Sequence, residues 1–367
     1  MLERDLLVRG ATIQDVARRA GVSPTSVSNY LNGRVGEMGE STRSRIAEAI
    51  SALGYVPSAA ARQLKTGRSP ILGLLLPTVA NPFYGELAVA IDAAAQAVGL
   101  RVILCNTQRN PAREADFIAQ LVADGVKGIL AASAVSDTQM LSRHVERGVA
   151  FVLLEVPGRN PGVAHVDSVA TDNIQAAALA VDHLVANGYR DIVYATATPL
   201  TPHRAERIEG FHGAMRRHGL GEGRVVTDEF LPASPAASGD ARLADYGRAL
   251  AKEIARMEPR PDAVVAMNDA IGFGLLAGLH DLQLHVPNDI AVISIDGTLL
   301  SRFSSPQLTA IRQPIEDIAA AAIECIRGRW ADRRRSGRAV ILSPVLAPGA
   351  SVRELARRDA TASSDLR

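Results

Sequence analysis

The pattern of hydrophobic and polar residues changes near residue 70. Before that point, apolar residues recur at helical spacing: Ile13, Val16, Ala17 and Ala20 fall at i, i+3, i+4 and i+7. After it, short apolar runs such as residues 71–76 alternate with longer amphipathic segments. Continuous apolar runs are typical of buried parallel strands, and their alternation with helices indicates βαβ units. The pattern predicts a small all-helical region followed by a larger α/β region.

Two short helices joined by a tight turn are predicted close to the N-terminus. Thr12 can cap the first helix, and Asp15 completes a weak capping box. Gly21 is suited to end that helix in a left-handed conformation. Ser23 and Pro24 then fit the N-cap and the first position of a second helix. The arrangement is typical of a helix-turn-helix.

The second helix has an outer face of small hydrogen-bonding side chains, formed by Thr25, Ser26, Ser28 and Asn29. Such a face, with almost no acid nearby, suits insertion into a DNA major groove. An ordinary helical hairpin is the alternative. The charge distribution favours DNA, because residues 1–68 carry ten Lys or Arg and six Asp or Glu, whereas the remainder carries 30 and 33.

A third helix is predicted from Ser41 to Leu53, after a glycine-rich loop at residues 33–39. Three short helices make one small core, which is marginal by itself. The alanine-rich segment 58–65 is predicted as a further helix that is too short to be stable alone in water. Its single large apolar residue, Leu64, could wedge between base steps in a minor groove. A plain linker is the alternative for this segment.

The rest of the chain is predicted to alternate between strands and helices in two series, separated by a Pro/Gly stretch at residues 157–162. Two such series suggest two similar lobes, with a ligand cleft between them at the C-terminal strand ends. The last two predicted strands, at 308–313 and 340–346, must complete sheets begun earlier, and a helix is predicted between them at 314–327. The other predicted strands are 71–76, 101–105, 126–131, 149–154, 192–197, 225–230, 263–267 and 290–295, and the other helices are 81–98, 111–123, 138–147, 172–187, 203–218, 243–257 and 271–282.

Composition narrows the class of protein. The 367 residues are 47% hydrophobic, which is enough for two or three domains with sizeable cores. No apolar run reaches the roughly 18 residues of a membrane span, and the N-terminus lacks the apolar segment of a signal peptide. We therefore expect a cytoplasmic protein with no membrane partner. Cys105 and Cys325 lie in apolar stretches and are interpreted as core residues.

The chain from residue 12 to residue 64 resembles the headpiece and hinge of the lac repressor family of bacterial transcription regulators. The resemblance rests on the stretches DVARRAGVSPTSVSNYLNG and STRSRIAEAISALGYVPSAAARQL. It implies an α/β fold class in which a small all-α headpiece precedes a two-lobed, periplasmic-binding-protein-like core with parallel sheets. It also implies a homodimer that binds palindromic double-stranded operator DNA, and a small effector that changes the affinity.

The resemblance implies a division of the chain as well. In this family the chain crosses between the two lobes three times, so each lobe is discontinuous. The expected parts are a headpiece at 1–57, a hinge at 58–69, a core at 70–352 with one lobe from 70–167 and 299–329 and the other from 168–298 and 330–352, and a disordered tail at 353–367.

Candidate DNA-binding residues follow from the helix geometry and the resemblance. The family often has arginine at the position of Asn29; since asparagine pairs best with adenine, either the operator differs there or Asn29 contacts only phosphate. Pro24 could offer only an apolar contact. Arg62 and Lys65 would follow the DNA backbone beside Leu64. The full set is Thr12, Ser23, Pro24, Thr25, Ser26, Ser28, Asn29, Asn32, Arg62, Leu64 and Lys65.

Candidate effector-binding residues lie at predicted strand ends. The resemblance matches residues 81–84 to the family's ligand-lining loop and places Arg207, Asn268 and Asp296 in the cleft. An arginine, an asparagine and an aspartate around an aromatic ring describe a sugar pocket, although nucleobases use similar groups. Each polar residue could instead be a helix N-cap or part of a surface pair. The full set is Asn81, Phe83, Tyr84, Arg207, Phe211, Asn268 and Asp296.

Two departures from the family leave the ligand open. After the fourth strand the family often has an aspartate and an arginine, where this chain has Leu-Glu-Val-Pro at residues 154–157. The last strand often ends in an arginine and a serine, where residues 347–351 read Ala-Pro-Gly-Ala-Ser. Neither departure affects the DNA-binding prediction.

Catalytic motifs are absent from the sequence. It has no Gly-x-Ser-x-Gly, no phosphate loop and no His-Glu-x-x-His, and its eight histidines show no metal-ligand spacing. We therefore predict no enzymatic activity, no metal and no cofactor. The sequence is interpreted as a transcriptional repressor switched by a sugar-like effector. The alternatives are a cytoplasmic sugar-binding protein and a corepressor-dependent regulator of nucleobase or other metabolism.

Overall fold

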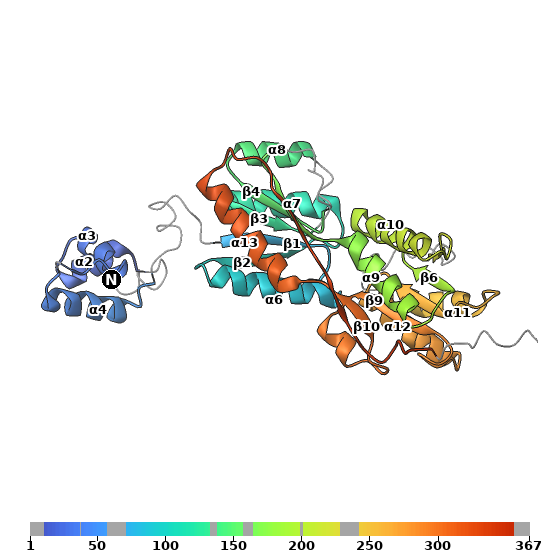
Figure 1. The fold of residues 1–367 in the computed structure, drawn as a ribbon. Coiled ribbons are helices and arrows are strands. Elements are labelled where there is room, and N and C mark those ends of the chain that lie inside the picture. The colour runs from blue at the N-terminus through green and yellow to red at the C-terminus, as the bar shows by residue number, and fades with distance from the viewer. Residues whose placement is uncertain are drawn as a thin grey trace, which may run out of the picture. The chain divides into compact units, whose positions relative to one another are not determined.

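The computed structural model describes residues 11–36, 38–56, 71–132, 138–156, 164–198, 201–227 and 242–355. The chain divides into two compact units, residues 1–70 and 71–367 (Figure 1). The predicted hinge, with Arg62, Leu64 and Lys65, lies outside the described residues. None of the helices in the described ranges combines the length and hydropathy that a membrane crossing requires.

The first unit is built on one small apolar cluster. Val16, Val27 and Ile46 have no exposed surface, and each comes from a different helix. The two helices of the predicted helix-turn-helix have the expected bounds, and the third begins at Glu40, one residue before the predicted start. The helices are α2 (Ile13–Ala20), α3 (Pro24–Leu31) and α4 (Glu40–Leu53).

Six parallel strands form the sheet of the first lobe in the second unit, in the order β11-β5-β4-β3-β1-β2. Alternate residues of a strand point to opposite faces. Leu74 therefore packs with helices α6 and α13, whereas Leu75 packs with α7 and α8. The elements are β1 (Ile71–Leu76), α6 (Pro82–Gln96), β2 (Arg101–Asn106), α7 (Pro111–Ala123), β3 (Gly128–Ala131), α8 (Thr138–Glu146), β4 (Ala150–Leu154), β5 (Asp167–Thr171), α13 (Ile315–Ala331) and β11 (Ala339–Leu342).

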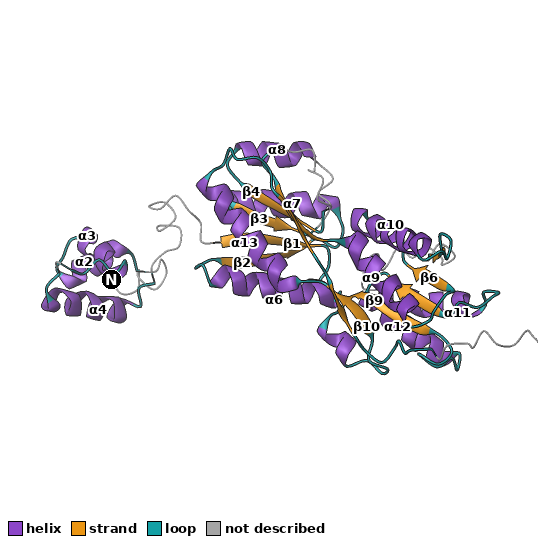
Figure 2. Ribbon diagram, viewed as in Figure 1, coloured by secondary structure: helices purple, strands orange, loops and turns teal. Residues whose placement is uncertain are grey.

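A second six-stranded sheet has the order β12-β10-β9-β8-β6-β7 and forms the second lobe (Figure 2). Its strands are parallel except for β12, which runs antiparallel to β10. The helices of this lobe pack in two pairs, α9 with α10 and α11 with α12. The elements are α9 (Asn173–Ala186), β6 (Ile192–Ala195), α10 (Pro202–Arg217), β7 (Arg224–Val226), α11 (Leu243–Ala255), β8 (Ala263–Ala266), α12 (Asp269–Asp281), β9 (Ala291–Asp296), the 3₁₀ helix η2 (Leu299–Arg302), β10 (Thr309–Arg312) and β12 (Val345–Ala347).

Glycines bring α11 and α12 unusually close together. A Cβ atom at Gly274 would overlap the carbonyl oxygen of Ala244, and one at Gly278 would lie 2.7 Å from the carbonyl oxygen of Arg248. Both distances are far below van der Waals contact. These helical glycines, which lack dinucleotide-binding spacing, therefore have a packing role.

The chain crosses between the lobes three times, but not at the predicted places. Strand β10 belongs to the second sheet, so the prediction that residues 299–313 lie in the first lobe is wrong. The predicted single strand 340–346 is two strands, β11 and β12, in different sheets. Pro344 stands between them, and it has no N–H to continue a ladder. The remaining difference is β5, which the sequence did not indicate and which keeps residues 167–171 in the first sheet.

Strand β5 begins at a fully buried carboxylate. Asp167 has no exposed surface, and it accepts hydrogen bonds from Arg329 Nη2 at 2.7 Å and from Arg335. The backbone N–H of Arg338 donates to the same carboxylate at 2.8 Å. Two residues of the basic run 332–338, Arg335 and Arg338, thus bind the start of β5, and the run is otherwise exposed, as expected of a surface loop.

The described chain ends on the second lobe. The N–H of Leu355 donates to the carbonyl oxygen of Asn187 at 2.9 Å, just after α9. Val352 is buried against the same core. Residues 353–355 are therefore part of the fold, contrary to the predicted start of a disordered tail at 353, and residues 356–367 lie outside the described ranges.

Candidate functional site

Helix α3 presents a polar face on the first unit. Thr25 is exposed and Ser26, Ser28 and Asn29 are half-buried, whereas Val27 on the opposite side is completely buried. The first turn of α3 carries no acidic residue. The small polar face predicted from the sequence is therefore present and accessible.

Two predicted DNA-binding residues serve as helix caps. Ser23 Oγ accepts a hydrogen bond from the N–H of Ser26 at 3.1 Å. Thr12 forms a reciprocal capping box with Asp15: Thr12 Oγ1 accepts from the Asp15 N–H, and the Asp15 carboxylate accepts from the Thr12 N–H at 3.0 Å. These side chains fix the start of each helix, where the exposed N–H groups favour a phosphate.

Asn32 and Asn29 play different structural parts at the end of α3. Asn32 Nδ2 donates to the carbonyl oxygen of Ser28 at 2.6 Å, which holds Asn32 against its own helix. Neither Asn29 nor Thr25 has a side-chain hydrogen bond to any residue within the described ranges. Base contact by Asn29 and Thr25 remains a prediction, and their side-chain hydrogen-bonding groups are not used by other described residues.

Arg43 supports the loop that follows α3. Its Nε donates to the carbonyl oxygen of Met38 at 2.8 Å, and its Nη2 donates to that of Val35 at 2.8 Å. Other arginines of the same unit, Arg19 and Arg45, are exposed, whereas Arg18 pairs with Asp15 at 3.3 Å. The basic character of the headpiece therefore does not depend on Arg43.

A second candidate site lies between the two lobes of the core. It is a narrow cavity with a free volume of about 20 Å³, formed where the C-terminal strand ends of both sheets meet. Ligand sites of open α/β folds lie at such strand ends. The cavity is lined by Asn81, Phe83, Tyr84, Arg109, Glu155, His203, Arg204, Arg207, Met267, Asn268 and Asp296.

The first-lobe wall of the cavity is formed by the start of α6 and the end of β4. Asn81 Oδ1 accepts from the N–H of Phe83 at 3.1 Å and so caps α6. Tyr84 Oη donates to Glu155 Oε2 at 2.8 Å. The ring of Phe83 meets that of Tyr84 edge-on, with centroids 5.2 Å apart. This wall therefore combines a fixed aromatic pair with one carboxylate.

The second-lobe wall centres on Arg207 of α10. Its Nε donates to Asn173 Oδ1 at 2.9 Å, and its Nη1 donates to the carbonyl oxygen of Met267 at 2.6 Å. The same Nη1 lies 3.7 Å from Asp296 Oδ1. Asn268 caps α12 by accepting from the N–H of Ile271. Both cavity asparagines are thus helix caps and lining residues at once.

Asp296 is held in an unusual state. Its φ of 131° is rare for a residue other than glycine, and such outliers cluster at functional sites. Burial raises the pKa of the Asp296 carboxyl well above its usual range, against the opposing attraction of Arg207. Gln313 Nε2 donates to Asp296 Oδ1 at 2.7 Å. The carboxyl is therefore fixed in position, in surroundings that disfavour its charged form.

His203 lies among arginines in the same cavity. Burial lowers the pKa of His203 well below 6.5, and the nearby charges of Arg207, Arg204 and Arg109 lower it further. Arg204 Nη1 also donates to the carbonyl oxygen of Ala197 at 3.2 Å. The imidazole is therefore neutral at physiological pH.

Hydrogen bonds link the two lobes beside the cavity. Thr171 Oγ1, at the end of β5, donates to Gln313 Oε1 at 2.7 Å, and Gln313 in turn binds Asp296. The N–H of Leu299 donates to Glu86 Oε1 on α6 at 2.7 Å. Asp296 is therefore joined through Gln313 to the first lobe, and Leu299 makes a second, separate link to it.

Phe211 does not belong to this cavity, contrary to the sequence prediction. Its side chain has no exposed surface and packs against Tyr194, with ring centroids 5.4 Å apart. It lies one helical turn beyond Arg207 on α10, and the residues of that helix that line the cavity, His203, Arg204 and Arg207, all precede it. Phe211 is a core residue of the second lobe.

Comparison with known families matches both parts of the chain. The model of bacterial regulatory proteins of the lacI family matches residues 12–58, and that of the periplasmic binding protein-like domain matches residues 181–352. The HTH-type transcriptional repressor PurR of Photobacterium profundum is 30% identical over 346 residues, which are 94% of this chain and 99% of the relative. The chain belongs to the lacI family. It is therefore related to DNA-binding transcriptional regulators throughout its length.

Other lacI-family proteins agree with this assignment. Catabolite control protein A of Priestia megaterium is 31% identical over 86% of this chain and 91% of the relative. The crystal structure of the lac repressor dimer bound to operator and the anti-inducer ONPF has a TM-score of 0.79, with 22% identity over 94% of this chain and 99% of that chain. At that identity the likeness establishes the fold.

The structure brings six of the seven predicted effector residues of this lacI-family chain into one cavity, and Phe211 is the exception. Their role as ligand contacts remains a prediction. Sequence reasoning missed Arg109, Glu155, His203, Arg204 and Met267. Some signal was present, because Arg109 follows a strand and Arg204 lies three residues before Arg207 on the same helix face.

Proposed function

We propose that this protein is a sequence-specific transcriptional repressor whose operator affinity changes when a small molecule binds between the lobes of its core. The observation that carries the proposal is the accessible polar face of α3 within a capped helix-turn-helix. Thr25 and Asn29 on that face have hydrogen-bonding groups at the surface and no acid beside them. Asparagine and threonine side chains in this position can read base edges in a major groove.

The inter-lobe cavity supports control by a ligand. It gathers three arginines, two asparagines, an aspartate and a glutamate around an aromatic pair, at strand ends of both lobes. Its free volume of about 20 Å³ holds about one water, so a larger ligand requires the walls to move. A ligand that binds one lobe arrangement better than another shifts the balance between them.

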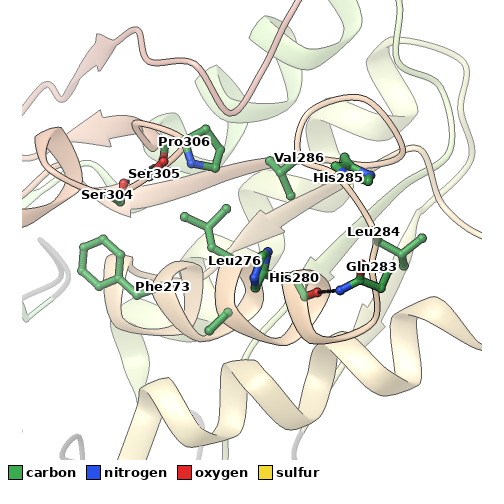
Figure 3. A pocket seen from close by; sticks show the side chains of 11 residues that line it. Phe273, Leu276, His280, Gln283, Leu284, His285, Val286, Ser304, Ser305 and Pro306 are labelled. Carbon is green, nitrogen blue, oxygen red and sulfur yellow. Dashed lines mark hydrogen bonds between the residues drawn. The ribbon is translucent and has the colours of Figure 1, made fainter.

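Apolar surface on the second lobe supports the homodimer that the family resemblance implies. A pocket of about 530 Å³ lies between α12 and residues 304–306, with Phe273 and Leu276 projecting from α12 toward Pro306 (Figure 3). Nearby in sequence, Phe303 is 75% exposed. Large exposed apolar side chains around a pocket are typical of protein interfaces. A dimer would present two headpieces to a palindromic site.

The decisive experiment selects DNA from a random duplex library with the full-length protein. We expect a palindromic consensus and a binding affinity that falls steeply with salt. In anisotropy titrations on that consensus, Asn29→Ala is expected to lose about 1–3 kcal/mol and to relax preference at one base position in each half-site. Ser44→Ala, an exposed change on α4, is the matched control and should bind like wild type.

Two results would count against the proposal. Selection without any consensus would remove sequence-specific binding altogether. An Asn29→Ala, Thr25→Ala double variant with unchanged affinity and consensus would remove α3 as the reading helix. Adding candidate ligands to the same titration gives the sign of control, since an inducer weakens and a corepressor strengthens operator binding.

A further inference from the structure

Three consecutive backbone N–H groups in the turn after β9 donate to carboxylates. Those of Gly297 and Thr298 reach Asp269 at 3.3 Å and 2.7 Å. That of Leu299 reaches Glu86 Oε1 at 2.7 Å. Asp269 is the first residue of α12 in the second lobe, whereas Glu86 lies on α6 in the first lobe. The turn therefore stands between two carboxylates that belong to different lobes.

Asp269 fixes the shape of this turn within the second lobe. It is 1% exposed, and its carboxylate also accepts from Thr298 Oγ1 at 2.7 Å and from Ser294 Oγ at 2.6 Å. A buried carboxylate that loses one of its donors keeps an unsatisfied oxygen, which is costly. The turn is thus a permanent part of the second lobe, and it begins directly after Asp296 at the inter-lobe cavity.

The contact with Glu86 differs, because both of its partners reach solvent. Leu299 is 52% exposed and Glu86 is half-buried. By contrast, Thr171 and Gln313, which form a link between the lobes beside the cavity, are 4% and 3% exposed. The N–H of Leu299 is the first of η2, and such groups have no partner within their own helix. Water can replace each partner when the lobes part there, so this contact can break and form again at little cost.

Like charges oppose the same contact. Burial raises the pKa of the Glu86 carboxyl, the bond from Leu299 lowers it, and the charges of Asp269 and Glu316 raise it further. Glu86 therefore lies close to two other carboxylates, and the N–H of Leu299 holds it to the turn against their repulsion. A contact between such opposing forces is closely balanced.

The same two elements form opposite walls of the inter-lobe cavity. Tyr84 precedes Glu86 by two residues on α6, Asp296 precedes Leu299 by three, and both Tyr84 and Asp296 line the cavity. A ligand larger than water requires these walls to move, since the free volume is about 20 Å³. Movement of α6 away from the turn lengthens the contact between Glu86 and Leu299. Widening the cavity and breaking this contact are therefore one motion.

We propose that Glu86 and the N–H of Leu299 form a releasable latch, which holds the lobes in the arrangement with the narrow cavity and opens when a ligand enters. The inference rests on the proposed function and names how its ligand is coupled to lobe movement. While the latch is closed, a ligand competes with it, so the latch lowers the apparent affinity of the cavity. Ligand binding and latch release therefore favour the same arrangement of the lobes.

Two variants remove the latch from opposite sides. Glu86→Met keeps the length of the side chain and removes the acceptor. Leu299→Pro removes the N–H, and proline suits this place, because Leu299 is the first residue of η2 and Thr298 before it has an extended backbone with φ −66° and ψ 164°. The matched controls are Glu316→Met, which removes an exposed carboxylate near Glu86, and Leu299→Ala, which keeps the N–H.

Hydrogen exchange measures the latch itself, including rare openings. In Glu86→Met the amide of Leu299 should exchange about tenfold faster than in wild type, the effect of one lost hydrogen bond to a charged group. The amides of Gly297 and Thr298, which bind Asp269, should keep their rates. Glu86→Gln retains a carbonyl acceptor and should give an intermediate rate, whereas Glu316→Met should exchange like wild type.

Spin labels measure the lobe separation in the full-length protein without DNA or ligand. The labels are attached at Gln120→Cys on α7 and Lys252→Cys on α11, and labelled chains are diluted with unlabelled protein. Both positions are exposed, whereas Cys105 and Cys325 are buried, so the labels are confined to the introduced sites. Each latch variant should shift the ratio of narrow to wide distances about tenfold toward wide. The double variant should shift it no further, because both changes break the same bond.

Three results would overturn the latch. They are an unchanged exchange rate of Leu299 in Glu86→Met, identical distance distributions in wild type and both latch variants, and a double variant whose effect is the sum of the two single effects. None of these touches the repressor, because operator selection is measured separately. Conversely, failure to select an operator would refute the repressor while leaving the exchange and distance measurements valid.

Discussion

Gln313 joins the two lobes beside the cavity, and its replacement by methionine tests the network directly. Its side chain is 3% exposed, accepts from Thr171 Oγ1 at 2.7 Å and donates to Asp296 Oδ1 at 2.7 Å. Methionine has a similar length and volume but can form neither hydrogen bond. The substitution thus keeps the packing and removes the polar link.

The size of the effect follows from what the substitution leaves behind. A buried hydroxyl and a buried carboxyl oxygen lose a partner, and each such loss costs about 1–3 kcal/mol. We expect Gln313→Met to lower the free energy of unfolding by about 2–5 kcal/mol. Thr171→Val removes only one bond and should cost about 1–2 kcal/mol. The double variant should show a coupling of about 1 kcal/mol, because both residues share that bond.

Urea unfolding of the full-length protein measures these values. The single tryptophan, Trp330, lies at the end of α13 in the first lobe, so its fluorescence reports that lobe, and circular dichroism reports all helices. Gln120→Met, an exposed change on α7, is the matched control and should unfold like wild type. Wild-type stability of Gln313→Met, with the control also unchanged, would refute the link.

Three further predictions concern other parts of the chain. Because burial lowers the pKa of His203, the unfolded chain binds a proton near pH 6.5 and the folded chain does not. The free energy of unfolding should therefore fall as the pH falls below about 6.5. Thermal melts at about pH 7.5 and about pH 5.5 should show a smaller loss of stability for His203→Gln than for wild type. Gly274→Ala should destabilise the core by about 1–3 kcal/mol, since its Cβ would overlap the Ala244 carbonyl oxygen. Gly213→Ala, in open space on α10, is the control and should be neutral or slightly stabilising. Equal melting temperatures of the two variants would contradict the packing role of Gly274. Val27→Ala should destabilise the headpiece by roughly 2 kcal/mol and weaken operator binding, because Val27 is completely buried. Val56→Ala, at a residue that is 81% exposed, is the control and should change neither property. Wild-type operator affinity of Val27→Ala would show that DNA binding does not depend on this buried core.

The elements with strong local signals were predictable from the sequence. Strand β1 and helices α2 and α3 have the predicted bounds, because a continuous apolar run or a cap at Thr12 and at Ser23 fixes each of them within a few residues. These interactions are short-range. A pattern read along the chain is sufficient to find them.

The elements that were missed depend on contacts from far along the chain. Strand β5 begins at Asp167, a charged residue that gives no strand signal, and its partners Arg329 and Arg335 come more than 160 residues later. The last predicted strand is split because the chain passes from the first sheet to the second at Pro344, and this crossing depends on the tertiary arrangement of the lobes. Hydrophobic periodicity carries no information about either.

The candidate cavity was predictable in part for the same reason. Asn81 and Asn268 follow strands and cap helices, so strand ends located them. Arg109 and Arg204 are single arginines with no periodic pattern, and only the meeting of two lobes places them in one cavity. The set of side chains that line the site is therefore a property of the tertiary structure.

The narrowness of the cavity connects ligand binding to lobe movement. A free volume of about 20 Å³ is far below that of any sugar or nucleobase, so admitting one must displace its walls. Those walls carry the links between lobes, from Leu299 to Glu86 and from Thr171 to Gln313. A ligand can shift an equilibrium only by its difference in affinity for the two arrangements. A cavity that must widen to admit its ligand favours one arrangement of the lobes over the other when the ligand is bound.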